Sequence, residues 1–266
     1  MNSLHLENMR GRFLALIVIV LLMSVTGFGQ IDGEAAYAAF LAWKSALETG
    51  LPWEVATEKY SAKLIAGGMT KAEAARTISI ISSRDEGAFY DPVFASTNPT
   101  FQTAPSKLLV EAVTKRKPGR ALDVAMGQGR NSIFLAKLGW EVTGFDTSKT
   151  GLAQARKAAT TAGVKVTTVL ASDEEFEFGT EQWDLIAILY PIEKRSIYRV
   201  RQALKTGGLV VVECGHKEAG NASFEYDTNE LLKIFDGFEI LKYEDSVGEH
   251  EWARKQLRVV RLIARK

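Results

Sequence analysis

The stretch Ala121–Asp146, ALDVAMGQGRNSIFLAKLGWEVTGFD, predicts the fold of this chain more clearly than any other. Residues 121–125 are apolar except for Asp123, which is typical of a buried parallel strand. A helix with one apolar face is expected over residues 131–138, and a second strand over 140–145. The order strand, turn, helix, strand predicts a right-handed crossover in a parallel α/β sheet.

Two glycines and two acidic residues should meet at one edge of this sheet. Gly127 and Gly129 form the turn after the first strand, where a backbone without side chains lets a ligand approach closely. Asp123 precedes the turn, and Asp146 ends the second strand. Ligands of such sheets bind beyond the carboxyl ends of the strands. We therefore expect both carboxylates to lie beside a ligand.

The two carboxylates favour one class of ligand over another. A dinucleotide would place a pyrophosphate over the turn, where Asp123 would repel it. The third glycine of dinucleotide sites is also replaced here, by Ser132. S-adenosylmethionine (SAM) has an ammonium group and a ribose but no phosphate. We expect Asp123 to attract the ammonium group and Asp146 to accept hydrogen bonds from both ribose hydroxyls.

A purely structural interpretation is open for each acid. Asp123 could cap the amides of the turn, and Asp146 could cap the helix that starts near Ser148. The two acids at this spacing favour the ligand-binding interpretation over two independent caps.

The same segment resembles motifs I and II of the class I SAM-dependent methyltransferases, which consist of an acid, a Gly-x-Gly turn, a helix and an acid that ends the second strand. The run GQGRNS at 127–132 is similar to the small-molecule branch that includes tellurite- and thiopurine-type enzymes. The chain departs from that branch at Ala125-Met126, where Gly-Cys is common.

This resemblance, which covers about residues 89–266 at the level of the fold, implies SAM as the cofactor and a small molecule as the methyl acceptor. It also implies a Rossmann-like, seven-stranded and mostly parallel α/β sheet with helices on both faces, whose last strand lies beside the fifth. The residues that would bind the cofactor are Asp123, Gly127, Gly129, Asn131, Asp146 and Asp173. Asp173 is included because an acid after the third strand often contacts the adenine amino group in this family.

The rest of the sheet can be placed from apolar runs and turn residues. The remaining strands are expected over 164–170, 183–190, 209–213, 238–244 and 256–264. The remaining helices of this domain are expected over 106–114, 149–162, 192–204 and 228–235.

Residues 1–29 are expected to be a signal peptide or a membrane anchor. Arg10 and Arg12 precede the apolar run 13–25, and small residues follow it. The run is short for a membrane-spanning helix. Cleavage would give a secreted or periplasmic protein, whereas an uncleaved anchor would leave a catalytic domain facing the cytoplasm.

Two further regions complete the predicted organisation. Residues 30–85 are expected to form a helical extension, and residues 86–266 the methyltransferase domain. Within the latter, residues 86–105 are rich in aromatic residues and prolines and are expected to be a connector. It would either fold over the cofactor as a lid, lined by Tyr90 and Phe101 among others, or be an ordinary loop with apolar contacts.

Composition limits the possible partners. The 266 residues carry a formal net charge of +1 and are 46% hydrophobic, which indicates a globular chain. No basic run suggests a nucleic-acid groove, so nucleic-acid partners are disfavoured. The single cysteine, Cys214, excludes an intrachain disulfide and a cysteine-rich zinc site, and no metal site is predicted. A membrane contact is expected only through residues 1–29.

Catalytic residues are harder to assign. Methyl transfer depends on alignment, and a base is needed only if the acceptor must lose a proton. The candidate bases, all expected at the carboxyl ends of strands, are Tyr190, Glu213 and His216, and His216 could equally be an ordinary histidine of a surface loop. The run LYPI at 189–192 lacks the Asn-Pro-Pro-Tyr type of motif used on nucleic acids and proteins, which favours a small acceptor. The alternative is a non-catalytic, exported SAM-fold or nucleotide-binding protein that serves in interactions.

Overall fold

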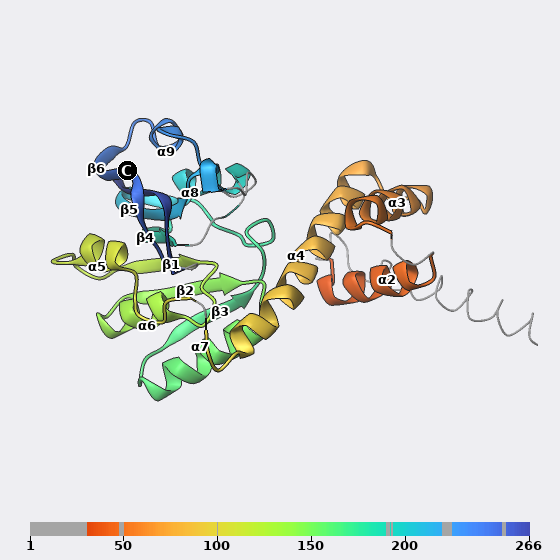
Figure 1. Cartoon of the computed structure of the whole chain (residues 1–266), viewed down its shortest axis with the longest axis horizontal. Coiled ribbons are helices and arrows are strands. Elements are labelled where there is room, and N and C mark those ends of the chain that lie inside the picture. Colours follow the sequence, from red (N-terminus) through yellow and green to blue (C-terminus); the bar gives the residue numbers. More distant parts are fainter. Residues whose placement is uncertain are drawn as a thin grey trace, which may run out of the picture. The chain divides into compact units, whose positions relative to one another are not determined.

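A computed structural model describes residues 31–47, 51–99, 101–189, 192, 194–219, 225–251 and 254–266 (Figure 1). The chain divides into two compact units, Met1–Arg84 and Asp85–Lys266. The expected signal peptide or anchor at 1–29 lies outside the described residues, and so does the candidate base Tyr190. Within the described ranges, no helix is both long enough and apolar enough to cross a membrane.

The first unit is helical. It contains α2 (Gly33–Ser45), α3 (Trp53–Ala66) and the first part of α4 (Lys71–Ala95). Its core is aromatic, because the Phe40 ring packs edge-on against Trp53 and Tyr60 at centroid distances of 5.1 and 5.2 Å. Phe40 is completely buried, and Ile81 of α4 belongs to the same apolar cluster, so the three helices share one core.

The second part of α4 corrects the sequence prediction. Residues 86–105 were expected to be a connector, yet the helix continues to Ala95, and only the segment that follows is irregular. Pro92 lies near the end of α4, where its missing amide removes one hydrogen bond and does not prevent one further turn. Tyr90 and Phe94, one helical turn apart, supply the packing that holds this end of the helix.

A seven-stranded sheet forms the centre of the second unit, in the order β3-β2-β1-β4-β5-β7-β6. The strands are β1 (Arg120–Val124), β2 (Glu141–Asp146), β3 (Val166–Leu170), β4 (Trp183–Ile188), β5 (Leu204–Gly215), β6 (Glu239–His250) and β7 (Lys255–Arg265). Strands β1 to β5 pair in parallel, and β7 runs antiparallel to both β5 and β6. The predicted sheet, including the last strand beside the fifth, is confirmed.

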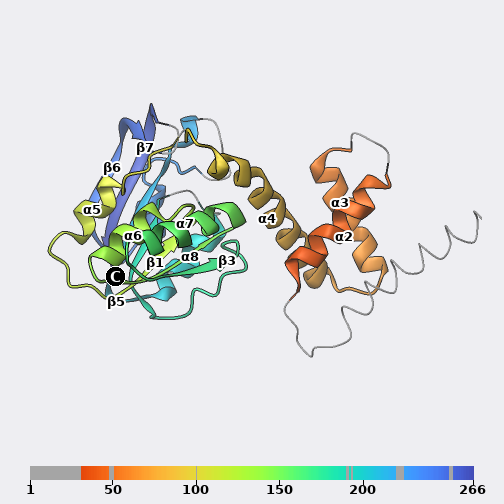
Figure 2. The same cartoon turned by 90° about the horizontal axis from the view of Figure 1, so that it is seen from below.

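Helices cover both faces of the sheet (Figures 1 and 2). They are α5 (Lys107–Val113), α6 (Arg130–Lys137), α7 (Lys149–Thr161), α8 (Lys194–Ala203) and α9 (Glu230–Ile234). Alternate strand residues enter two separate apolar layers: Leu185 packs with α5 and α6, whereas Ile186 packs with α8 and α9.

The strand register places the carboxyl ends of β1, β2 and β4 side by side at one edge of the sheet. Val124 at the end of β1 pairs with Phe145 of β2 and with Ile188 of β4. The hairpin between β6 and β7 ends at the same edge, because Gly215 at the end of β5 pairs with Val259. Segments from the two halves of the sheet therefore meet where ligands of parallel sheets bind.

Candidate active site

The turn between β1 and α6 uses backbone in the left-handed region. Ala125, Gly127 and Gly129 have φ angles of 53°, 51° and 76°. Glycine adopts this region freely, whereas a residue with a Cβ loses about 1–2 kcal/mol there. Ala125 therefore holds backbone strain beside the candidate site, at a position where glycine would not.

Three amides of this turn donate to other groups of the protein. The Met126 amide donates to the Phe145 carbonyl at 2.9 Å, and the Gly129 amide donates to the Met126 carbonyl at 2.8 Å. The Gly127 amide donates to Asp146 Oδ2 at 2.8 Å. A phosphate-binding turn needs free amides that point at the anion. These three amides are taken, and one of them is taken by a carboxylate.

Asp146 ends β2 directly beside the turn. Besides the bond from Gly127, its Oδ1 accepts a hydrogen bond from the Ser148 amide at 2.8 Å. Burial raises the pKa of Asp146, while the amide bonds from Ser148 and Gly127 act in the opposite direction. A carboxylate offers about four acceptor positions, and the amides of Gly127, Ser148 and Thr147 leave about one of them for a further donor. The capping role and a ligand-binding role are compatible.

Asp123 lies beneath the turn and is only 1% exposed. Its Oδ2 accepts a 2.7 Å hydrogen bond from Ser132 Oγ in the first turn of α6. Burial raises the pKa of Asp123 to about 6, opposed by the hydrogen bonds from Ser132 and by the charge of Arg130. The carboxyl group thus ties β1 to α6, as the capping interpretation expects. At this exposure a ligand would not contact the Asp123 carboxyl group directly.

The end of α4 packs directly on the turn, which the sequence analysis missed. A Cβ on Gly127 would come within 2.8 Å of the Phe94 ring, and one on Gly151 within 3.0 Å. The side-chain amides of Gln154 and Gln128 donate to the Phe94 carbonyl at 2.6 and 3.3 Å. Glycine at 127 is therefore required by the contact with α4 as well as by its φ angle.

Asp91, also on α4, fixes the start of α7. Its Oδ1 accepts hydrogen bonds from Ser148 Oγ at 2.6 Å and from the Thr150 amide at 2.9 Å. A Cβ on Gly87 would lie 2.1 Å from the Thr147 carbonyl oxygen, so the helix backbone touches the loop after β2. The helical spacing of Tyr90 and Phe94 was the available sequence signal for this helix end.

Asn131 and Asp173 have different surroundings from those expected. Asn131 is buried, and its Oδ1 accepts a 2.9 Å hydrogen bond from the Ser106 amide, which joins α6 to the start of α5. Asp173 follows β3, and its carbonyl accepts a 2.9 Å hydrogen bond from Arg199 Nη1, which fixes the backbone there. The adenine contact of Asp173 stays a prediction, and the side-chain oxygen of Asn131 is engaged by the Ser106 amide.

His216, another candidate base, is 4% exposed just after β5. Its Nδ1 accepts a 3.2 Å hydrogen bond from the Glu218 amide, and its Nε2 lies 3.1 Å from Thr228 Oγ1. An Nδ1 that accepts an amide proton leaves the ring proton on Nε2 in the neutral form. Both ring nitrogens are thus engaged by the protein, which gives His216 a structural role in this arrangement.

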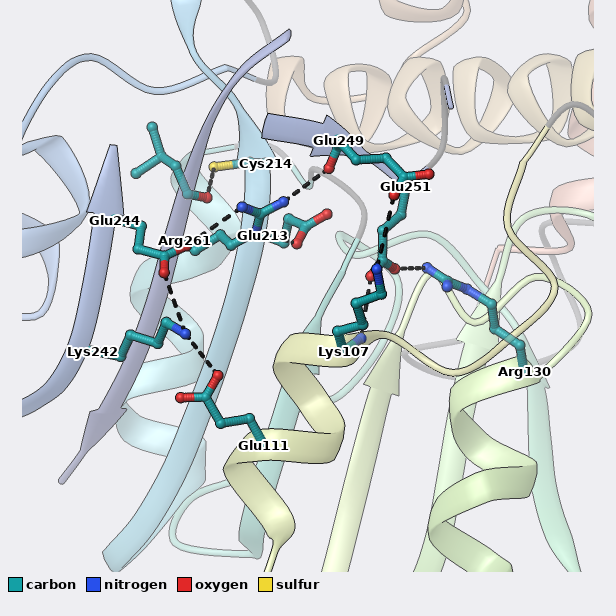
Figure 3. A network of polar contacts seen from close by, with 11 residues as sticks. Lys107, Glu111, Arg130, Glu213, Cys214, Lys242, Glu244, Glu249, Glu251 and Arg261 are labelled. Atoms are coloured by element: carbon teal, nitrogen blue, oxygen red, sulfur yellow. Dashed lines mark hydrogen bonds and ion pairs between the residues drawn. The ribbon is translucent and has the colours of Figure 1, made fainter. Parts of the chain in front are cut away.

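A cavity of about 320 Å³ opens between α5 and the strands β5, β7 and β6 (Figure 3). We call it the charged cavity, because four cationic and five acidic side chains line it. The contacts that shape it involve Arg130, Glu213, Lys242, Glu244, Glu251 and Arg261. Arg130 follows Gly129 directly, so one wall of the cavity adjoins the glycine turn.

Two ion pairs with little exposure form the inner part of the charged cavity. Arg261 Nε donates to Glu213 Oε2 at 2.7 Å, and Arg130 Nη2 donates to Glu251 Oε2 at 2.7 Å (Figure 3). The pKa of Glu213 is raised by burial and by the nearby charge of Glu251, against the hydrogen bond from Arg261. Sequence analysis noted Glu213 at a strand end, but its partners lie far away in the chain.

The described residues contain no group of three or more His, Cys, Asp or Glu side chains arranged to hold a metal ion. Cys214 is free and buried, in a strand of the core.

Known proteins with similar sequences and structures match the second unit. A family model described as "Tellurite resistance protein TehB" matches residues 96–262. A Haemophilus influenzae protein (strain KW20) named "Probable S-adenosyl-L-methionine-dependent methyltransferase TehB" is 26% identical over 153 residues, which are 53% of this chain and 53% of that protein. The chain thus spans about half the length of the curated relatives it matches.

Solved structures show the same fold. The crystal structure of TehB from Haemophilus influenzae aligns with a TM-score of 0.55 and 21% identity, over 68% of this chain and 66% of that chain. The [4+2]-cyclase SpnF aligns with a TM-score of 0.54 and 19% identity, over 69% and 96%. The family match begins at residue 96, after α4, and still covers more than half of the 266 residues. The chain therefore belongs to the TehB family of tellurite resistance proteins.

Proposed function

We propose that this protein is a SAM-dependent methyltransferase that acts on a small molecule. The observation that carries the proposal is the pairing of the Gly127 amide with Asp146 at the carboxyl edge of the sheet. It takes up a donor that a phosphate would need, and it favours a ligand whose hydroxyl groups can donate to the carboxylate. Membership of the TehB family and the name of the Haemophilus relative support the same conclusion.

The residues present fit SAM by their chemistry. Asp146 keeps an acceptor position for a ribose hydroxyl, and Asp173 follows β3, where an acid could accept from the adenine amino group. Gly127 and Gly129 allow close approach of the ligand to the backbone. SAM when bound supplies an electrophilic methyl group. The protein would hold the acceptor in line with that methyl group and exclude water from the site.

The acceptor is proposed to need no strong base. Both nitrogens of His216 are hydrogen-bonded within the protein, so the ring would have to break a contact before it accepted a proton. A thiol or a chalcogen oxyanion brings a nucleophile that is ionised, or partly ionised, at neutral pH. The family description, a tellurite resistance protein, agrees with a soft acceptor of this kind.

Binding of S-adenosylhomocysteine to an Asp146→Ala variant tests the proposal. Loss of the ribose acceptor should weaken binding by about 2–4 kcal/mol, measured by isothermal titration calorimetry. Glu141→Ala is the matched control, because Glu141 is the carboxylate at the other end of the same strand. Equal affinity in both variants would show that Asp146 does not contact the ligand.

A second candidate function is a SAM-fold protein that does not transfer methyl groups. The neighbour SpnF is named as a [4+2]-cyclase, so this fold does not determine the reaction. A labelled-methyl assay with thiols, selenite, tellurite and phenols separates the two candidates. Methyl transfer to any of them supports the first, whereas cofactor binding without any transfer favours the second.

We also propose that the N-terminal segment directs export. The basic residues Arg10 and Arg12 before the apolar run 13–25 are the basis of this proposal. Sequencing the N-terminus of the protein made in cells tests it. A start near residue 30 supports cleavage, whereas an intact N-terminus in a membrane fraction supports an anchor.

A further inference from the structure

The strands on the α5 side of the sheet change from apolar to charged at its carboxyl edge. On β5, the core-facing residues Leu209 and Val211 are followed by Glu213, which is only 6% exposed. On β7, the core-facing Ile263 has Arg261 as its next neighbour on that face. Charged side chains are rarely buried in positions that continue an apolar layer, so this pair calls for an explanation.

Stability does not explain the pair of Glu213 and Arg261. Replacing a buried ion pair by apolar side chains of similar size is often neutral or stabilising, because two charges no longer have to be removed from water. The layer could have continued with leucine and methionine. Glu213 and Arg261 lie instead at the sheet edge where ligands bind, and they line the same cavity as Arg130, which follows the glycine turn.

Both members of the pair keep unused hydrogen-bonding capacity. Arg261 donates to Glu213, to Glu244 and to the Glu249 carbonyl, which uses three of the five donors of a guanidinium (Figure 3). Glu213 accepts from Arg261 and from the Glu251 amide, which uses about half of its acceptor positions. A ligand can therefore bind without displacing either ion.

We infer that the charged cavity is the acceptor subsite and that it selects small, amino-acid-like molecules with both an ammonium group and a carboxylate. Glu213 and Glu251 would receive the ammonium group, and Arg261 and Arg130 the carboxylate. Carboxylates and guanidinium groups alternate along the inner wall, which suits a dipolar molecule better than an apolar one. This inference rests on the proposed methyltransferase function and names its substrate class.

Four thiols of similar size test the inference. L-cysteine carries both charges, cysteamine only the ammonium group, 3-mercaptopropionate only the carboxylate, and 2-mercaptoethanol neither. Binding is measured by NMR titration of the full chain saturated with S-adenosylhomocysteine, so that no transfer occurs. We expect each singly charged thiol to bind roughly tenfold more weakly than L-cysteine, and the neutral thiol more weakly still.

A double variant, Glu213→Leu with Arg261→Met, should remain folded and lose this preference. The matched control is Glu239→Leu with Arg265→Met, which removes an ion pair between β6 and β7 at the end of β7 away from the cavity. The control should keep the ranking of the four thiols. Retention of the ranking in the cavity variant would overturn the inference.

Two other outcomes would also test the inference or the function on which it rests. Equal binding of all four thiols by the unmodified chain, or tighter binding of selenite than of L-cysteine, would overturn the inference and leave the proposed function standing. Failure to bind S-adenosylhomocysteine at all would remove the proposed function itself. The two failures are therefore distinguishable within one set of titrations.

Discussion

The two halves of the carboxyl edge are built in different ways. On the β1–β2 side, the turn, Asp123 and Asp146 come from one continuous stretch of sequence and are held by amides and a hydroxyl group. On the β5–β7–β6 side, Glu213 and Arg261 come from distant strands and hold each other as ions. Burial raises the pKa of Asp123, Asp146 and Glu213 alike, but the groups that stabilise the charged form differ between the two halves. The first half is a local motif, and the second exists only once the sheet has formed.

The largest effect is expected where an ion loses its partner. Arg261→Met alone leaves Glu213 buried without its cation, and should lower the free energy of unfolding by about 3–5 kcal/mol. Adding Glu213→Leu should restore most of that loss, because neither charge then remains buried. Urea unfolding of the single and double variants measures both. If the double variant is as unstable as the single one, the pair is essential to the fold and the contrast between the two halves fails.

The pH dependence of stability should distinguish Asp123 from an ordinary surface acid. Its folded pKa of about 6 lies above its ordinary value of 3.8, so the folded state keeps a proton that the unfolded chain loses. The free energy of unfolding of the unmodified chain, relative to that of Asp123→Asn, should fall as pH rises from about 4 to about 6 and should then level off. The total fall should be on the order of 3 kcal/mol. Urea unfolding at a series of pH values gives the difference. A constant difference across this range would show that Asp123 is not buried as described.

The contact between α4 and the start of α7 should matter less. Asp91→Ala removes the carboxylate that caps α7 through Ser148 and Thr150, which should cost about 1 kcal/mol of stability. Thermal unfolding measures it, with Glu58→Ala, which removes an exposed acid of α3, as the comparison. An equal loss in both variants would mean that the cap is not formed.

The smallest effect is a gain. Ala125→Gly should relieve the left-handed backbone and stabilise the chain by about 0.5–1 kcal/mol, after the greater flexibility of glycine in the unfolded chain is counted. Gly129→Ala, at a φ of 76°, should have the opposite sign. Unfolding midpoints measure both. A loss of stability with glycine at 125 would show that the Cβ of Ala125 makes contacts worth more than the strain.

The β1–β2 side of the carboxyl edge could be predicted from the sequence, because its residues come from one continuous stretch. The strands around Asp123 and Asp146, the turn and the sheet class follow from apolar runs and glycine spacing within one stretch. The charged cavity could not be predicted, because Arg130 and Glu251 meet only after β6 and β7 are placed beside β5. The end of α4 was missed because Pro92 suggests a loop, whereas the packing of Phe94 on Gly127 decides in favour of a helix.

Isothermal titration of the unmodified chain with S-adenosylhomocysteine and, separately, with NAD tests the central claim most directly. A turn whose amides are bound to Asp146 and to backbone carbonyls should bind the phosphate-free nucleoside at submillimolar concentration and give no heat with NAD. Binding of NAD that S-adenosylhomocysteine cannot displace would contradict the account.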